Sequence, residues 1–393
     1  MSIYSLSDKI VFRALKFIKF GYLKLINHDG KIFYFGNSDE KLKVELKINK
    51  PGLTYQIIKS GSVGLAEAYM KGEFETDNLT NLIELTAKNI NLVYKFSGIL
   101  DLPIINKLKS LFVKNNKSRS KKNIARHYDL GNNFFALWLD QSLTYSSAIF
   151  EKQKEDLYSA QINKYKKLTE LIKPSSGNKI LEIGCGWGGF AEYIGKNHDV
   201  NIDCITISKE QFNFAKKRIF DNGLNDKVQI LLKDYRDVEY KYDSIASIEM
   251  IEAVGQNYLY NYFKTIKKNL SSNGKAAIQA ITIDDNLFDR YKSKEDFIQK
   301  YIFPGGFLPS KKKLYDLSDN NGLVIDKYQS YGSHYSNTLK IWRDEFMKKW
   351  EEISKQGFDN QFKRMWQFYL SYCEAGFKSK NIDLIQFSMQ NKI

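Results

Sequence analysis

The second half of the chain alternates between short apolar runs and longer stretches whose apolar residues recur at helical spacing. The run 180–183 predicts a buried strand, and further strands are expected over 202–207, 228–232, 244–248, 276–283 and 323–330. The stretches between them predict helices over 156–173 and 190–196 and two more that end near 222 and 270. This alternation predicts an α/β fold, a doubly wound parallel sheet with helices on both faces. A last run, 382–389, is expected to add an antiparallel strand at the sheet edge.

The first part of the chain has a different pattern. Residues 31–35 and 42–48 alternate as short strands, and a helix is expected from 79 to about 95. Residues 3–27 are apolar and basic together, which predicts a basic amphipathic helix. Such a helix can lie on a membrane, and an ordinary surface helix explains it equally well.

These patterns divide the chain into two domains. We expect a small N-terminal α+β domain over 1–112, where contact with lipid would occur, and a catalytic domain over 124–393. The segment 113–123 is rich in Lys, Asn and Ser, as in a solvated basic linker.

The net charge of +15 adds one constraint, because a basic surface is attracted to polyanions such as nucleic acid or anionic lipid headgroups. No apolar run is long enough to span a bilayer, and no signal-peptide pattern is present. The three cysteines and four histidines have neither disulfide nor metal-ligand spacing, so no metal is expected. A reducing, cytoplasmic setting fits this pattern.

Candidate chemistry begins where the run 180–183 ends. Glu182 is followed by Gly184, Gly186 and Gly188, so a strand, a glycine turn and a helix would place backbone N–H groups around a nucleotide-like ligand. The pattern resembles the first motif of S-adenosylmethionine (AdoMet) methyltransferases, and a plain turn is the alternative.

In such enzymes the next two strand ends hold the ribose and the adenine. The ribose candidates here are Thr206, Ser208 and Gln211. The adenine candidates are Asp234, Tyr235 and Arg236, although Asp234 could also be a simple helix cap.

Further sequence blocks point to one family among these methyltransferases. They are His127-Tyr-Asp-Leu-Gly-Asn, Tyr145-Ser-Ser-Ala, the glycine turn, Thr206-Ile-Ser, Tyr301-Ile-Phe-Pro-Gly-Gly-Phe and Phe362-Lys-Arg-Met. With them the chain resembles the cyclopropane-fatty-acyl-phospholipid synthases and the related mycolic acid cyclopropane synthases. The resemblance adds Tyr145, Ser146, Cys185 and Trp187 to the cofactor-binding set.

The resemblance also implies a reaction. The double bond of an unsaturated phospholipid acyl chain attacks the AdoMet methyl group, and loss of a proton from that methyl closes a cyclopropane ring. A methyl- or methylene-branched chain is the alternative product, after a hydride shift and loss of a different proton. The enzyme would work from the cytoplasm on the inner, anionic face of the membrane, as a homodimer or as a monomer.

In this family a bicarbonate ion serves as the base. The matching positions are Glu252, Tyr335 and the backbone of Ile281, but the family's cysteine is replaced by Ser147 and its histidine by Gln279. These departures leave methyl transfer intact and put bicarbonate use in question. Cys373 matches a cysteine that has been assigned as an active residue, yet its apolar helical stripe favours a structural role.

Two rival functions remain open at this level. An RNA methyltransferase would suit the positive charge, but no RNA-binding module is visible, so no nucleic-acid partner is expected. A lipid-binding protein that has lost catalysis would not need the glycine turn or Glu252.

Overall fold

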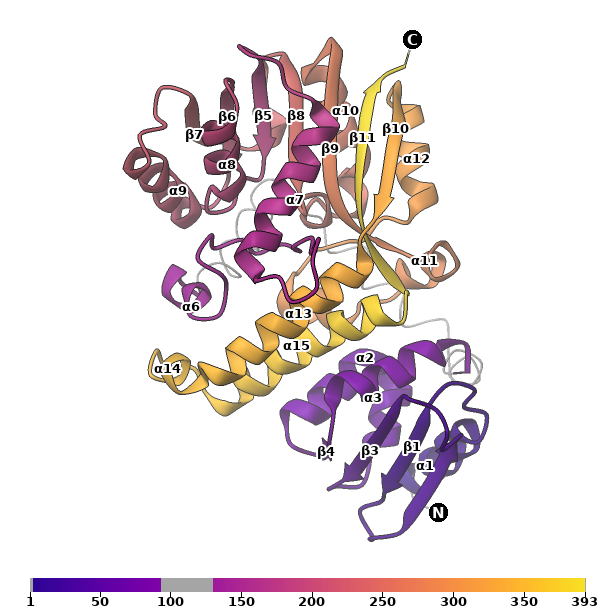
Figure 1. The fold of residues 1–393 in the computed structure, drawn as a ribbon. Coiled ribbons are helices and arrows are strands. Elements are labelled where there is room, and N and C mark those ends of the chain that lie inside the picture. Colours follow the sequence, from indigo (N-terminus) through magenta and orange to yellow (C-terminus); the bar gives the residue numbers. More distant parts are fainter. Residues whose placement is uncertain (1–2, 93–129, 393) are drawn as a thin grey trace.

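A computed structural model describes residues 3–92 and 130–392 (Figure 1). The predicted basic linker 113–123 and His127 lie outside the described residues. The N-terminal part contains α1 Ile3–Leu15, β1 Tyr22–Ile26, β2 Ile32–Gly36, β3 Lys43–Ile48, α2 Leu53–Met70, β4 Phe74–Thr76 and α3 Leu79–Lys88.

The catalytic part contains seven strands. They are β5 Lys179–Ile183, β6 Asn201–Thr206, β7 Val228–Leu232, β8 Tyr242–Ile248, β9 Leu270–Ile283, β10 Leu323–Ser330 and β11 Ile382–Asn391. Its helices are α6 Asn132–Ala136, α7 Leu157–Ile172, α8 Gly189–Asn197, α9 Lys209–Asp221, α10 Leu259–Asn269, α11 Asp285–Tyr291, α12 Lys311–Asn320, α13 Gly332–Lys348, α14 Trp350–Ser354 and α15 Asn360–Lys378. Short helical turns are η2 Tyr235–Asp237, η3 Ile251–Ala253, η4 Gln256–Tyr258 and η5 Ile298–Ile302.

The seven strands form one sheet in the order β10-β11-β9-β8-β5-β6-β7. Strands β5 to β9 are parallel, which confirms the predicted doubly wound α/β class. The predicted edge position of the last strand is wrong, because β11 lies between β10 and β9, antiparallel to both. Residues 384–389 of β11 are all buried, and a strand buried on both faces needs backbone partners on both sides.

Helices cover both faces of this sheet (Figure 1). On one face, α7, α8 and α9 contribute Leu168, Ile194 and Ile219 to a core that also contains side chains of β5 and β6. On the other, α10 and α12 contribute Phe263 and Leu314 to a second core. Because β5 to β9 are parallel, their carboxyl ends lie at one common edge of the sheet, which is where ligands bind in open α/β sheets.

Helices α13 and α15 lie side by side between that edge of the sheet and the N-terminal domain (Figure 1). The small domain has a four-stranded sheet in the order β2-β1-β3-β4, and its α2 and α3 pack on α15. The Tyr69 hydroxyl donates to Gln367 Oε1 at 2.9 Å across this junction.

The N-terminal helix is shorter than predicted. It ends at Leu15, and residues 22–26 form β1, where Leu23 and Leu25 are buried and their neighbours only half-buried. That period of two is typical of a strand, and Gly21, at φ 91°, supplies the turn before it. The helix predicted from 79 to about 95 is interrupted at Asn89, which caps α3 and hydrogen-bonds the Phe20 and Leu85 carbonyls; residues 90–92 are helical again, and 93–95 lie outside the described residues.

Candidate active site

The glycine turn forms an open cradle at the end of β5. Gly184, Gly186 and Gly188 have φ values of 84°, 53° and 83°, in the left-handed region that favours glycine. A Cβ atom at Gly186 would meet nothing within 4 Å, whereas at Gly184 it would lie 2.9 Å from Met250. The turn therefore leaves space for a ligand directly against the backbone.

Glu182 lies beneath this turn with its side chain buried. Its Oε2 has no hydrogen-bond partner within the described part of the chain, and burial raises the pKa of the carboxyl to about 7. A buried acceptor beside an open glycine cradle fits AdoMet, whose polar groups would supply the missing partner.

The predicted ribose contacts are gathered at the end of β6. Ser208 caps α9 by accepting from the Gln211 N–H at 3.3 Å, and the Thr206 hydroxyl donates to Gln211 Oε1 at 3.0 Å. All three side chains are buried. They form a compact polar cluster next to the glycine turn.

The predicted adenine contacts are arranged differently. Asp234 caps η2 and binds Arg236 through both oxygens, at 2.8 and 2.6 Å. The Tyr235 ring packs against Tyr262 in the core, with ring centroids 5.7 Å apart. The structure thus shows internal roles for these residues, and their contact with adenine stays a prediction.

The Tyr145-Ser-Ser block and the turn share a neighbour, because the Phe135 ring lies 5.2 Å from Tyr145 and 5.1 Å from Trp187. Tyr145 and Tyr369 share a hydrogen bond of 2.8 Å between their hydroxyls, and Trp187 Nε1 donates to Asn132 Oδ1 at 2.7 Å. Ser146 Oγ accepts from Lys164 Nζ at 2.7 Å. Cys185 is buried, which raises the pKa of its thiol, so it packs rather than reacts.

The centre of the predicted base site is occupied by Glu249, a residue that the sequence reasoning missed. Its Oε1 accepts from the Ser147 N–H and from Gln279 Nε2, both at 2.8 Å. Its Oε2 accepts from the Tyr335 hydroxyl at 2.6 Å. Three of the five residues matched to bicarbonate binding therefore converge on a carboxylate of the chain itself.

Glu249 holds this position in a strained backbone. Its φ is 49°, and a left-handed residue other than glycine costs roughly 1–2 kcal/mol. Burial raises the pKa of its carboxyl, while the Tyr335 hydroxyl, the Gln279 amide, the Ser147 N–H and the Lys164 ammonium oppose that rise. Strain that persists at a buried carboxylate suggests a function for it.

Glu252 lies one turn further along. One of its oxygens accepts from the Ile281 N–H, and Oε2 has no partner among the described residues. Burial first, and the Glu249 carboxylate second, raise the pKa of Glu252 to about 8. Repulsion between these neighbouring carboxyls favours ionisation of only one of them, and the three donors directed at Glu249 favour its ionised form.

A bicarbonate ion does not fit this arrangement. Ser147, Gln279 and Tyr335 point their donors at Glu249, and the Ile281 N–H points at Glu252. The donors matched to the anion already have partners, and a second anion beside the Glu249 carboxylate would be repelled.

Lys164 is the second residue that the sequence reasoning missed. It is fully buried on α7, and burial lowers the pKa of its amine to about 7, against the attraction of Glu249, Asp140 and Glu182. A signal was present, because Lys164 falls on the apolar stripe of α7 with Ala160 and Leu168. Glu249 likewise follows a buried strand, where parallel strands present ligand-binding residues.

An aromatic cluster adjoins the base site. The Tyr335 ring lies 6.1 Å from Trp342, which lies 5.4 Å from Tyr145, and Trp138 packs on both. Such a cluster excludes water and tolerates a cation. Cys373 packs at its border, and burial raises the pKa of its thiol, so the structure favours the structural role predicted for it.

The fold and the glycine cradle define a class, the AdoMet-dependent methyltransferases. A family model described as mycolic acid cyclopropane synthetase matches residues 115–387, and a domain of unknown function matches 20–95. The chain belongs to the cyclopropane synthase family and is an AdoMet-dependent methyltransferase similar to cyclopropane-fatty-acyl-phospholipid synthase.

Individual relatives agree with this assignment. The tuberculostearic acid methyltransferase UfaA1 of Mycobacterium tuberculosis is 35% identical, covering 93% of this chain and 87% of that protein. The cyclopropane-fatty-acyl-phospholipid synthase of Escherichia coli K12 is 34% identical, covering 87% and 86%. The crystal structure of mycolic acid cyclopropane synthase CmaA1 with SAH and CTAB matches with a TM-score of 0.65 at 28% identity, covering 69% and 98%.

Two features are absent from the part of the chain that the structure describes. None of the helices over 3–92 and 130–392 is long and apolar enough to cross a membrane. Across the same residues, His, Cys, Asp and Glu form no group that could hold a metal ion.

Proposed function

We propose that the protein transfers the AdoMet methyl group to the double bond of an unsaturated phospholipid acyl chain, with Glu249 as the base that replaces bicarbonate. The observation that carries the proposal is the set of three donors directed at the Glu249 carboxylate. The relative named cyclopropane-fatty-acyl-phospholipid synthase supports the substrate class.

When bound, AdoMet supplies an electrophilic methyl group. The glycine cradle would hold it, and the polar cluster of Thr206, Ser208 and Gln211 would bind its ribose. The alkene π electrons form the new carbon–carbon bond while the carbon–sulfur bond breaks, and the aromatic cluster keeps water from the resulting carbocation. Glu249 then accepts a proton from the added methyl, and the released electron pair closes the cyclopropane ring.

A branched product is the second candidate, and one observation favours it. Ser147 and Gln279 replace the family's cysteine and histidine, and the carboxylate they bind belongs to the chain. A base in a different position could remove a proton after a hydride shift, which leaves a methylene branch. Mass spectrometry of lipids from expressing cells shows a gain of one methylene unit either way, and mild hydrogenation then reduces only the branched alkene.

The base is tested with Glu249→Gln and Glu249→Gly. Both remove the carboxylate, so we expect turnover to fall about a hundredfold or more while AdoMet affinity changes little. Glu249→Gly also relieves the left-handed backbone and opens space among the three donors, so added bicarbonate should restore part of its activity.

The wild-type protein is the control in this experiment, and its turnover should not change when bicarbonate is stripped from the buffer. Near-normal turnover of Glu249→Gln, or a wild-type enzyme that needs bicarbonate, would refute the assignment. In the second case Glu252 would again be the better candidate to hold the anion.

We further propose that the enzyme works in the cytoplasm at an anionic membrane surface. Support comes from the net charge and from exposed aromatic side chains on the N-terminal domain, Phe17 and Phe20. Whether it forms a homodimer stays a prediction.

A further inference from the structure

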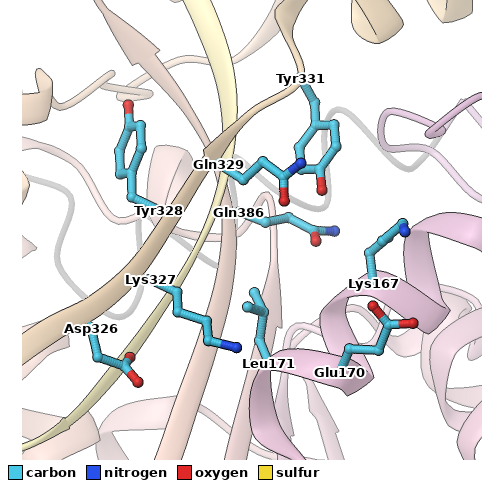
Figure 2. A pocket seen from close by; sticks show the side chains of 9 residues that line it. All are labelled: Lys167, Glu170, Leu171, Asp326, Lys327, Tyr328, Gln329, Tyr331 and Gln386. Atoms are coloured by element: carbon cyan, nitrogen blue, oxygen red, sulfur yellow. The ribbon is translucent and has the colours of Figure 1, made fainter.

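The hydrogen bond between Glu249 and Gln279 is the first of a series that continues to Gln386 on β11. Gln386 lies directly opposite Gln279 in the antiparallel pairing of β11 with β9. Its Nε2 donates to Gln279 Oε1 at 2.9 Å and to the Lys164 main-chain carbonyl at 3.3 Å. Figure 2 shows the Gln386 side chain extending from β11 toward α7, in the wall of a surface pocket of about 470 Å³.

The donor-to-acceptor direction of these hydrogen bonds is fixed at the Lys164 carbonyl. A main-chain carbonyl can only accept hydrogen bonds, so the Gln386 NH₂ group must face Lys164. The same NH₂ group then faces Gln279 Oε1, which leaves the Gln279 NH₂ group to face Glu249.

This direction matters because a terminal amide can turn by half a rotation with almost no change in shape. A reversed Gln279 would present its oxygen to Glu249, and two acceptors in contact would favour the protonated carboxyl. The weak bond from Gln279 Nε2 to the Ser147 carbonyl, at 3.3 Å, opposes reversal only in part.

We infer that Gln386 is a positioning residue that holds the Gln279 amide with its NH₂ group toward Glu249, so that this carboxylate is ready to accept a proton. The inference rests on the proposed role of Glu249 and adds a residue that is 107 positions from Gln279 in the sequence. Gln386 is 2% exposed and acts through Gln279 alone.

The charged and titratable groups near these hydrogen bonds are unchanged when Gln386 is replaced by an apolar residue. Those that face Glu249 are Lys164 from α7, Glu252 from η3, Tyr335 from α13 and Tyr369 from α15. Those that line the pocket beside Gln386 are Lys167 and Glu170 on α7 and Asp326 and Lys327 on β10. A shift in the pH profile after substitution therefore reports on the amide chain.

The test is Gln386→Met, which keeps the length of the side chain and removes its donor. With vesicles of dioleoylphosphatidylglycerol and AdoMet, we expect kcat to fall about tenfold. We also expect the acid limb of the kcat profile to move to higher pH, because the ionised Glu249 loses a donor. The KM for AdoMet should stay within about twofold.

A double-mutant cycle separates positioning from general damage. Gln279→Met should shift the profile in the same direction, and Gln386→Met should add little in that background. Gln329→Met is the matched control, because Gln329 is the cross-strand neighbour of Gln386 on β10 and lines the same pocket but is exposed. If Gln386→Met does not fold, Gln386→Asn withdraws the amide from Gln279 and carries the same expectation.

A profile of the folded Gln386 variant that superimposes on the wild type would overturn the inference, as would an undiminished effect in the Gln279→Met background. Glu249→Gln in the same assay distinguishes the two levels. If it is inactive while Gln386→Met is normal, only the positioning role fails. If Glu249→Gln keeps turnover, the proposed base fails and the positioning role fails with it.

Discussion

Glu249 and Glu252 are three residues apart and have different environments. Glu249 accepts hydrogen bonds from three donors, whereas Glu252 accepts one and keeps a buried oxygen without a partner among the described residues. Donors favour an ionised carboxylate, and burial favours a neutral carboxyl. This difference predicts that Glu249 acts as the base and that Glu252 remains protonated near neutral pH.

Protonation of Glu252 has a consequence for stability. Its pKa is raised to about 8 in the folded protein, so its contribution to stability is present at low pH and is lost as pH rises toward 8. Glu252→Gln keeps the acceptor for the Ile281 N–H and cannot ionise. We expect the melting temperature of the variant minus that of the wild type to be a few degrees larger at pH 9 than at pH 5. A difference in melting temperature that stays constant over that range would contradict the prediction.

The strands of the large sheet could be predicted because most contain a short apolar run that is bounded by turn residues. The position of β11 could not, because neighbours in a sheet are chosen by contacts far apart in sequence. The same limit hid the base site, where Ser147 and Glu249 are 102 residues apart and Tyr335 lies 86 residues further on. Glycine turns and strand ends can be recognised from neighbouring residues in the sequence. Side chains from distant segments meet only in the folded structure, so their convergence cannot be recognised in that way.

A buried carboxylate connects α15 both to the N-terminal domain and to α13. Glu374 is 1% exposed, pairs with Arg343 of α13 and accepts from the Thr80 hydroxyl of α3 at 3.1 Å. Glu374→Leu would leave the Arg343 guanidinium without its main partner. Because Arg343 is partly exposed, we expect a loss of about 2 kcal/mol in unfolding free energy rather than the full cost of a broken buried pair.

Chemical denaturation measures this loss, and an exposed ion pair on α13 offers a control. Glu345 and Lys348 of α13 form an exposed ion pair at 3.3 Å, so Glu345→Gln should change stability by less than about 1 kcal/mol. Equal effects of the two substitutions would show that the buried pair does not stabilise the domain junction.

At the scale of the whole molecule, charge and exposed apolar groups occur together on the N-terminal domain. Phe17 and Phe20 follow α1 and are 60% and 53% exposed, and the exposed basic residues Arg13, Lys16 and Lys19 lie beside them. Helices α2 and α3 face the catalytic domain, which leaves α1 and the sheet on the outer side (Figure 1). A surface of this kind can insert aromatic rings among headgroups while its cations meet anionic lipid.

Membrane binding should therefore have an electrostatic part and an apolar part. Co-sedimentation with vesicles should increase with anionic lipid and decrease with salt, because exposed charges are screened over about 8 Å at physiological ionic strength. The double variant Phe17→Ser with Phe20→Ser should bind roughly a hundredfold more weakly, since full burial of one aromatic side chain contributes roughly 1.5–3 kcal/mol and both rings are a little over half exposed. Phe220→Ser is the control, because Phe220 is 70% exposed on α9 of the catalytic domain. If Phe220→Ser weakens binding as much as the double variant, the docking surface lies elsewhere, and salt-independent binding to neutral vesicles would exclude the electrostatic part.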